Sequence, residues 1–241
     1  MGKDVIVACD FPSAGETLDF LDTLGPVRPF VKIGMELYYA EGPEIVRTLK
    51  KRGCRVFLDL KLHDIPNTVK KAMAVLSGLG ADIVNVHAAG TRAMMAAALE
   101  GLTRPDGSRP LLIAVTQLTS TDAVALAEEL LISRPMPEVV AHYARSAKAA
   151  GLDGVVCSPL EAAGVHEACG RSFLTVTPGV RFSDGDRGDQ KRVMTPAEAK
   201  KAGSDYIVVG RPITASKDPA GAYRRCLEEF LDGKGRNDGS I

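Results

Sequence analysis

The sequence lacks the features of a nucleic-acid-binding or membrane protein. It has no tryptophan and carries no net charge, with 30 basic and 30 acidic residues. No basic block interleaves with its few aromatic residues, so no nucleic-acid partner is expected. No apolar run approaches the roughly 18 residues needed to span a membrane, and the first residues do not form a cleavable signal. We therefore expect no membrane partner and a cytoplasmic location.

Clustered metal ligands and a dinucleotide-binding turn are also missing. The five cysteines are scattered singly without a CxxC pair, and the four histidines are not spaced as a ligand set. An odd number of cysteines argues against a disulfide framework. These patterns predict reduced, mostly buried cysteines and no zinc site.

Short apolar, β-rich runs alternate along the chain with segments of helical period. The expected strands lie near residues 5–9, 29–34, 54–59, 82–87, 111–117, 154–158, 173–178 and 206–210. Eight such βα units within 241 residues predict an α/β fold, a (β/α)8 TIM barrel, as a single domain. A doubly wound sheet is the alternative, but the GxGxxG turn that often follows its first strand is absent. The barrel is expected over residues 1–232, followed by a polar tail at 233–241.

The run DLKLHDIPNT, residues 59–68, places a lysine between aspartates at the end of an expected strand. Side chains alternate along a strand, so Asp59 and Lys61 should share a face, with Asp64 in the following turn. Neighbouring carboxylates favour the ammonium form of Lys61, which suits it to donate a proton. A solvated charge cluster at a strand end is the alternative interpretation of this motif taken alone.

Other polar residues also follow the expected strands. In a (β/α)8 barrel the carboxyl ends of the strands meet at one rim, where active sites lie. Convergence there favours one site over unrelated polar rim residues. The candidates besides Asp59, Lys61 and Asp64 are Asp10, Lys32, Thr116, Thr119, Arg181 and Arg211.

Residues 178–181 (PGVR) and 209–212 (VGRP) follow the seventh and eighth expected strands, where such barrels often bind phosphate. Glycine lets backbone N–H groups approach the oxygens, and an arginine fork matches phosphate geometry. Residues 182–189 are long for a βα turn and are interpreted as a mobile lid, with Gln190 at its far end. An ordinary surface loop is the alternative.

These motifs together resemble the orotidine 5'-monophosphate decarboxylase family over nearly the whole chain. The resemblance rests on residues 59–68, ACD at 8–10, VKIG at 31–34, TQLTS at 116–120, PGVR at 178–181, GDQ at 188–190 and VGRP at 209–212. It implies a barrel-shaped carboxy-lyase of UMP biosynthesis. It also implies a homodimer with composite sites and no cofactor or metal.

The resemblance also implies roles for individual residues. Lys61 would protonate C6 of the pyrimidine, Asp59 would lie against the departing carboxylate, and Lys32 would complete the charged array. The remaining assignments are Asp64, Ile65 and Thr68 to the partner's site, Asp10 and Lys32 to the ribose, Thr119 to the region near the base, and Pro178, Arg181, Gln190, Gly210 and Arg211 to the phosphate side.

Two enzymes and a silent binder remain as alternatives. Magnesium-dependent keto-sugar-phosphate decarboxylases and aldolases of the same suprafamily share the DxKxxD core, but a glutamate ligand stands there where this chain has Lys32. A protonated lysine cannot ligate Mg²⁺. A Schiff-base aldolase would need an unprotonated Lys61. A non-catalytic phosphate binder would be expected to lack Lys61 or one of its aspartates.

Overall fold

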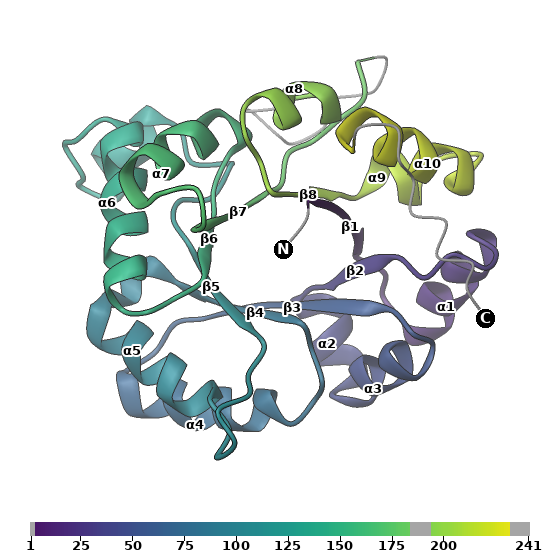
Figure 1. Ribbon diagram of the computed structural model, residues 1–241, viewed down its shortest axis with the longest axis horizontal. Helices are drawn as coiled ribbons and strands as arrows, with labels where there is room; N and C mark the ends of the chain where they lie inside the picture. The colour runs from purple at the N-terminus through teal and green to yellow at the C-terminus, as the bar shows by residue number, and fades with distance from the viewer. Residues whose placement is uncertain (1–2, 184–193, 232–241) are drawn as a thin grey trace.

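The protein is a closed barrel of eight parallel strands surrounded by helices (Figure 1). The structure, a computed structural model, describes residues 3–183 and 194–231. The strands are β1 (Asp4–Cys9), β2 (Phe30–Ile33), β3 (Arg55–Leu62), β4 (Ile83–His87), β5 (Leu111–Val115), β6 (Gly154–Val156), β7 (Leu174–Thr177) and β8 (Tyr206–Val209). Each pairs with its sequence neighbours, and β8 pairs with β1. The predicted (β/α)8 barrel is confirmed.

Helices connect the strands and form the outer layer in Figure 1. They are α1 (Ala14–Thr23), α2 (Met35–Glu41), α3 (Glu44–Lys51), α4 (Pro66–Ser77), α5 (Thr91–Leu102), α6 (Met136–Ala149), α7 (Ala162–Cys169), α8 (Pro196–Lys201), α9 (Arg211–Thr214) and α10 (Pro219–Phe230). Short helical turns add η1 (Ala88–Gly90), η2 (Ala125–Glu129) and η3 (Pro159–Glu161).

Local sequence signals set where several helices begin. The Thr195 side chain accepts a hydrogen bond from the Glu198 N–H, and the Glu198 carboxylate accepts one from the Thr195 N–H, which together start α8. Asp218 caps α10 by accepting from the Gly221 N–H. Both starts follow from the local sequence, because capping side chains satisfy backbone donors that a helix leaves free.

Strand side chains alternate between two apolar cores. In β1, Val5, Val7 and Cys9 belong to the core between the barrel and its helices, whereas Ile6 and Ala8 point into the barrel. The inner core also contains Phe30, Phe57, Ile83, Ile113, Val176, Tyr206 and Val208. The barrel centre is therefore filled with packed apolar side chains, and polar chemistry is confined to its ends.

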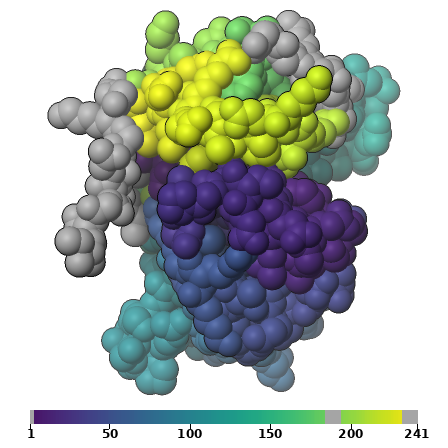
Figure 2. Space-filling model, turned by 90° about the vertical axis from the view of Figure 1, so that its right-hand side faces the viewer, coloured from purple at the N-terminus to yellow at the C-terminus, as the bar shows by residue number. Residues whose placement is uncertain are grey.

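The two ends of the barrel sequence meet at one seam. Val5 aligns with Ile207 across the β1–β8 pair. Figure 2 shows the C-terminal helices, in yellow, lying against the N-terminal segment, in purple. Tyr223, Cys226 and Phe230 of α10 are buried in the outer core. Closure at this seam brings Asp10 beside the end of β8.

The five cysteines are buried and free of disulfides, as predicted. No helix in the described ranges 3–183 and 194–231 is long and apolar enough to cross a membrane. Most of the predicted lid, Gln190 and the predicted tail at 233–241 lie outside the described residues.

Candidate active site

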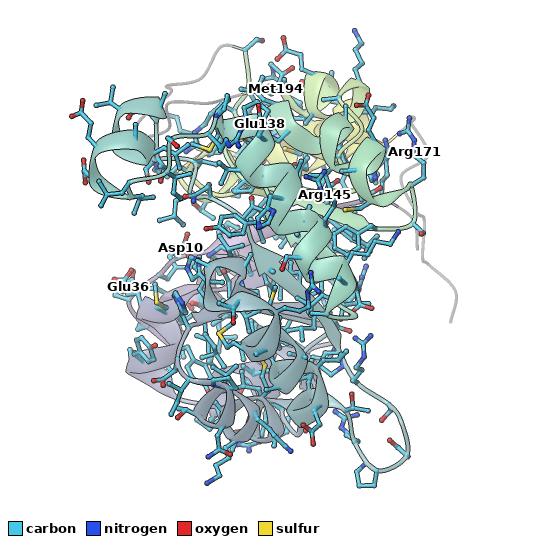
Figure 3. All side chains as sticks on the ribbon, turned by 90° about the vertical axis from the view of Figure 1, so that its left-hand side faces the viewer. Asp10, Glu36, Glu138, Arg145, Arg171 and Met194 are labelled. Carbon is cyan, nitrogen blue, oxygen red and sulfur yellow. The ribbon has the colours of Figure 1, made fainter. Side chains whose placement is uncertain are left out.

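The polar residues predicted from the sequence lie at the carboxyl ends of the strands. In β2, β3 and β4 the next inward position after the apolar layer is Lys32, Asp59 and Asn85, respectively. Asp10 follows β1 and so marks the carboxyl ends of the strands, whereas Arg171 precedes β7 and marks their amino ends. In the side view of Figure 3 these two residues lie on opposite sides of the molecule. The charged groups therefore gather at one rim, where (β/α)8 barrels carry their active sites.

Two lysines and two aspartates form a continuous charged cluster. Lys32 Nζ lies 2.7 Å from Asp10 Oδ1 and 3.6 Å from Asp59 Oδ2. Lys61 Nζ lies 2.8 Å from Asp59 Oδ1. Each oxygen of the Asp59 carboxylate thus faces a different ammonium group, and Asp59 itself is only 7% exposed. The structure brings these four predicted residues together.

Burial and charge act in opposite directions on this cluster. Burial alone would raise the pKa of Asp59, but the charges of Lys32 and Lys61 and the hydrogen bonds from Lys61 and Asn85 hold it below its ordinary value. Burial would lower the pKa of Lys32, yet Asp59 and Asp10 raise it. The carboxylate and the ammonium are both charged at neutral pH, which provides fixed charges in a largely buried site.

The end of β3 departs from a regular strand. The strand was predicted to end near residue 59 but continues to Leu62. Its register against β4 shifts between Leu58 and Leu62, and Lys61 has a φ of 53°, in the left-handed region. Lys61 and Asp59 still reach one another, as predicted, but a bulge and not plain strand alternation directs the lysine.

Asn85 and Gly34 also belong to the site, although no role was predicted for either from the sequence. Asn85 is buried in β4 and donates from Nδ2 to Asp59 Oδ1 at 2.6 Å. An ideal Cβ on Gly34 would stand 3.1 Å from Asp10 Oδ1 and 3.2 Å from Lys32 Nζ, so glycine leaves room for that ion pair. A signal for Asn85 was available, since it is a lone amide in the otherwise apolar run IVNV at 83–86.

His87 adds a titratable group at the end of β4. Its ring centroid lies 5.7 Å from that of His63. Burial lowers the pKa of His87, and the charges of His63 and Lys61 lower it further, against an opposing effect of Asp59. His87 is therefore neutral at neutral pH.

Asp64, Ile65 and Thr68 lie on the exposed segment that leads into α4. The Asp64 carboxylate accepts a hydrogen bond from the Ile65 N–H at 2.6 Å. Ile65 is 67% exposed, which is unusual for a branched apolar side chain. The structure therefore places these three residues at the surface beside the charged cluster and not inside it.

The candidate phosphate residues follow the adjacent strands β7 and β8. Pro178 and Arg181 follow β7, and the Arg181 N–H donates to the Met194 carbonyl at 3.0 Å. Gly210 and Arg211 follow β8, and Arg211 is exposed at the start of α9. These four residues share the rim with Asp10, whereas Gln190 falls outside the described residues.

The two threonines that follow β5 differ in their surroundings. Thr116 is buried and its hydroxyl donates to the Val156 carbonyl at 2.9 Å, which is a structural bond between neighbouring strands. Thr119 is half-buried farther along the loop. Only Thr119 stays a candidate for contact with a bound molecule.

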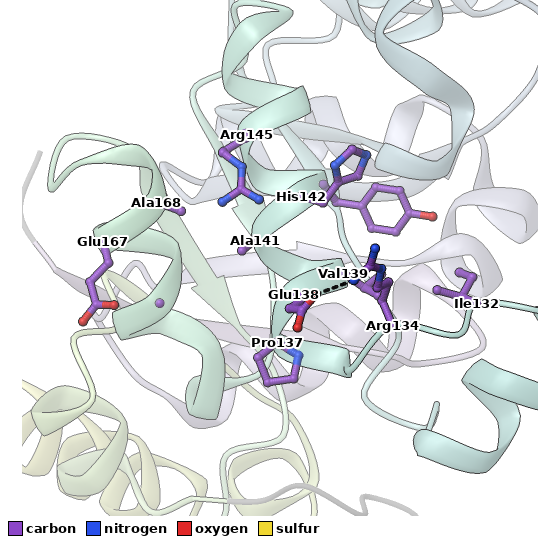
Figure 4. Close-up of a pocket in the computed structure, with 12 residues that line it drawn as sticks. Ile132, Arg134, Pro137, Glu138, Val139, Ala141, His142, Arg145, Glu167 and Ala168 are labelled. Atoms are coloured by element: carbon purple, nitrogen blue, oxygen red, sulfur yellow. Dashed lines mark ion pairs between the residues drawn. The ribbon is translucent and has the colours of Figure 1, made fainter.

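A separate groove of about 870 Å³ lies on the outer face of α6 and α7 (Figure 4). Its lining includes Tyr143, His142 and an ion pair in which Arg134 Nη1 lies 3.8 Å from Glu138 Oε2. None of its lining residues belongs to the charged cluster. Its position on the helical layer separates it from the strand ends, so the charged rim is the better candidate site.

Metal coordination finds little support in the described part of the chain. Across residues 3–183 and 194–231, no group of three or more histidine, cysteine, aspartate or glutamate side chains is arranged to hold a metal ion. Between Asp10 and Asp59 the position is filled by the Lys32 ammonium.

Comparison with known proteins agrees with this geometry. A model of the orotidine 5'-phosphate decarboxylase / HUMPS family matches residues 3–226. The chain belongs to this family. It is 61% identical over 237 residues to the orotidine 5'-phosphate decarboxylase of Bacillus caldolyticus, with 97% of each chain covered. A crystal structure of orotidine 5'-phosphate decarboxylase from Lactobacillus acidophilus superimposes with a TM-score of 0.85 at 43% identity, covering 95% of this chain and 99% of that one.

A second solved structure extends the same comparison. An uncharacterized conserved protein from Geobacillus kaustophilus is 56% identical and has a TM-score of 0.82, covering 94% of this chain and 99% of that one. The barrel and the chain length are thus shared with both solved structures.

Proposed function

We propose that this protein decarboxylates orotidine 5'-phosphate to uridine 5'-phosphate and CO2, a step of UMP synthesis. The observation that carries the proposal is the Lys61 ammonium, held 2.8 Å from the buried Asp59 carboxylate at the barrel rim. Family membership and the names of the relatives support the same reaction. A fixed cation in a buried site is suited to a reaction whose transition state gains negative charge.

Lys61 is the proposed proton donor. When the C6–carboxylate bond breaks, CO2 leaves and the electron pair stays on C6, in the ring plane and without an adjacent electron sink. The ammonium stabilises this charge and then transfers one proton from Nζ to C6, leaving a neutral amine that is reprotonated from solvent. Because the cation is already in place, little reorganisation accompanies the reaction.

Asp59 and Lys32 hold the proposed donor in place. Asp59 pairs with Lys61 through one oxygen and faces Lys32 through the other, so the three charges fix one another. In the proposed complex Asp59 lies against the departing carboxylate. Lys32 and Asp10, already paired at 2.7 Å, hold the ribose hydroxyls.

Binding at a distance from C6 positions the substrate. The residues proposed to hold the phosphate are Arg181, Arg211, Gly210 and Gln190, with Pro178 beside them. Thr119 is proposed to contact the substrate near the base. The free energy of phosphate binding would then offset the cost of orienting the base over Lys61.

A homodimer with composite sites is proposed from the exposed segment that precedes α4. Asp64, Ile65 and Thr68 are exposed in the single chain, and Ile65 presents an apolar side chain to solvent. Burial of this segment against a second copy would remove that apolar surface from water. The three residues would then contribute to the partner's active site.

The proposed reaction needs no cofactor. Lys32 supplies a fixed ammonium between Asp10 and Asp59, in the position where the magnesium-dependent relatives have a glutamate ligand. Its pKa is raised by the two aspartates, so it stays a cation and cannot bind Mg²⁺. The donor set therefore favours the decarboxylase over the metal-dependent enzymes.

The deciding experiment follows the loss of near-UV absorbance of orotidine 5'-phosphate, with and without EDTA. Decay that is indifferent to EDTA is expected. Lys61→Ala should lower kcat by at least ~10³-fold, because it removes both the charge and the proton. Arg211→Ala should mainly raise KM, by about 10- to 100-fold, for the loss of a charge-assisted bond.

Lys51→Ala is a matched control, since Lys51 is 79% exposed on the outer helix α3. It should leave both constants unchanged. No decay with the parent protein, or decay abolished by EDTA, would refute the proposed reaction. Near-normal turnover by Lys61→Ala would refute the proposed role of the lysine.

Mixing Lys61→Ala chains with Asp64→Ala chains tests the composite site. Each variant alone should be nearly inactive, but a mixed dimer has one site in which both residues are native. Partial recovery of activity is expected, and its absence after verified subunit exchange would exclude Asp64 from the partner's site.

A further inference from the structure

Asn85 of β4 connects the two central residues of the charged cluster. It is 1% exposed, and its side chain uses both of its polar atoms. Nδ2 donates to Asp59 Oδ1 at 2.6 Å, and Oδ1 accepts from the backbone N–H of Lys61 at 2.8 Å. The opposite orientation of the amide would place oxygen against oxygen and N–H against N–H, so the two bonds determine it.

The backbone at Lys61 needs this support. A φ of 53° is sparsely populated by residues other than glycine, and the β3–β4 ladder shifts register at this point. The Lys61 N–H is therefore directed to a side chain, where a regular strand would bond the neighbouring backbone. Asn85 supplies the acceptor and holds the conformation that carries the ammonium group toward Asp59.

The Asn85 side chain also holds the Asp59 carboxylate. Asp59 Oδ1 receives both Asn85 Nδ2 and Lys61 Nζ, while Oδ2 faces Lys32 at 3.6 Å. A carboxylate held by a hydrogen bond and two ion pairs has little freedom to rotate. One amide thus sets both the Asp59 orientation and the Lys61 backbone.

We propose that Asn85 is a positioning residue for catalysis, because it locks the left-handed Lys61 backbone and the Asp59 carboxylate into one geometry. The inference rests on the proposed decarboxylase function. A misplacement of a catalytic group by about 1 Å can lower a rate by about 100-fold. Asn85 bonds none of the residues assigned to the phosphate, so its effect should fall on kcat and not on binding.

Asn85→Leu is the first test, since it keeps a similar size and removes both bonds. Its kcat for orotidine 5'-phosphate should fall at least tenfold, per folded molecule. KM and the affinity for the product uridine 5'-phosphate should stay within about threefold of the parent. A kcat within twofold of the parent would overturn the inference, whatever the change in thermal stability.

Asn85→Asp provides a readout that a purely structural role would not produce. As a carboxylate it repels Asp59 and cannot donate to it, but when protonated it can donate to Asp59 and accept from the Lys61 N–H. Asp59 and Lys61 of β3 bond this position directly, Lys32 of β2 faces the same Asp59 carboxylate, and His87 of β4 interacts electrostatically with Asp59 and Lys61.

The kcat of Asn85→Asp relative to the parent should therefore rise as the pH is lowered from 8 to 5. A ratio that stays flat over this range, or that falls at low pH, would overturn the inference. The measurement on Asn85→Asp does not require the leucine variant to fold.

Thr175→Val is the matched control. Thr175 is fully buried in β7, and its hydroxyl bonds Asp205 at 3.0 Å, among the outward-facing side chains of the barrel. The Thr175→Val variant should be less stable than the parent but should keep the parent's kcat. Because the parent is assayed in parallel, an inactive parent would refute the proposed function, whereas an active parent with equally active Asn85 variants would refute only the inference.

Discussion

Replacing Lys32 with methionine tests the electrostatics of the charged cluster directly. The lysine side chain is 11% exposed, as is the side chain of Asp59, and the two lie 3.6 Å apart. Lys32→Met keeps much of the apolar volume and removes the ammonium. Asp59 is left buried with Lys61 and Asn85 as its remaining partners.

The loss of folding free energy in Lys32→Met depends on the partners that Asp59 keeps. Removing one member of a buried ion pair costs about 3 to 5 kcal/mol when the other charge is left uncompensated. Asp59 retains Lys61 at 2.8 Å and the Asn85 bond at 2.6 Å, so the loss here should be smaller. We expect about 2 kcal/mol, which corresponds to a fall in Tm of about 4 to 8 °C for a chain of this size.

The cost should depend on pH in a defined direction. Although burial opposes it, the lysine charges and hydrogen bonds lower the pKa of folded Asp59 below that of the unfolded chain, about 3.9. Its stabilisation is therefore present above that value and is lost as the pH falls through the folded pKa. The pKa of Lys32 is raised, so its own contribution is complete well below pH 10. The Tm gap between parent and Lys32→Met should be full at pH 7 and narrow below about pH 4.

Thermal unfolding followed by circular dichroism at pH 7, 5 and 3.5 measures this gap. Parent and variant are compared at equal protein concentration, because subunit association would shift Tm. Lys51→Met is the control, since its ion pair with Glu44 is 3.9 Å long and exposed, and it should change Tm by less than about 2 °C. A gap below 1 °C at pH 7, or one that widens with acid, would refute the reasoning.

Two glycine substitutions test the close approaches in the structure. Gly34→Ala places a Cβ 3.1 Å from the Asp10 carboxylate, so KM should rise about threefold to tenfold in steady-state assays with little change in Tm. Gly101→Ala on α5 places a Cβ 2.0 Å from the Lys70 carbonyl of α4 and should lower stability by about 1 to 3 kcal/mol in chemical denaturation. Gly164→Ala on α7, where a Cβ meets nothing within 4 Å, should be neutral or stabilising by up to about 1 kcal/mol. Equal changes in stability for Gly101→Ala and Gly164→Ala would contradict the packing argument.

Local patterns in the chain were sufficient to predict the eight-strand order and the residues at the strand ends, and they contain the capping signals that start α8 and α10. These features depend on local periodicity and capping chemistry, which act between residues a few positions apart. Asp59, Lys61 and Lys32 could be selected in the same way, because each lies at or near the carboxyl end of an apolar strand. The general rule that such strands end at one rim then predicts that they meet.

The way in which these residues meet depends on contacts between distant parts of the chain. Asn85 bonds Asp59 across 26 positions of sequence, and Lys32 reaches Asp10 across 22. The left-handed conformation of Lys61 and the extension of β3 to Leu62 also follow from pairing with β4. Such contacts are set by barrel closure and strand register, which sum over many weak interactions along the chain. No local pattern encodes them, so the chemistry could be predicted from the sequence and its exact geometry could not.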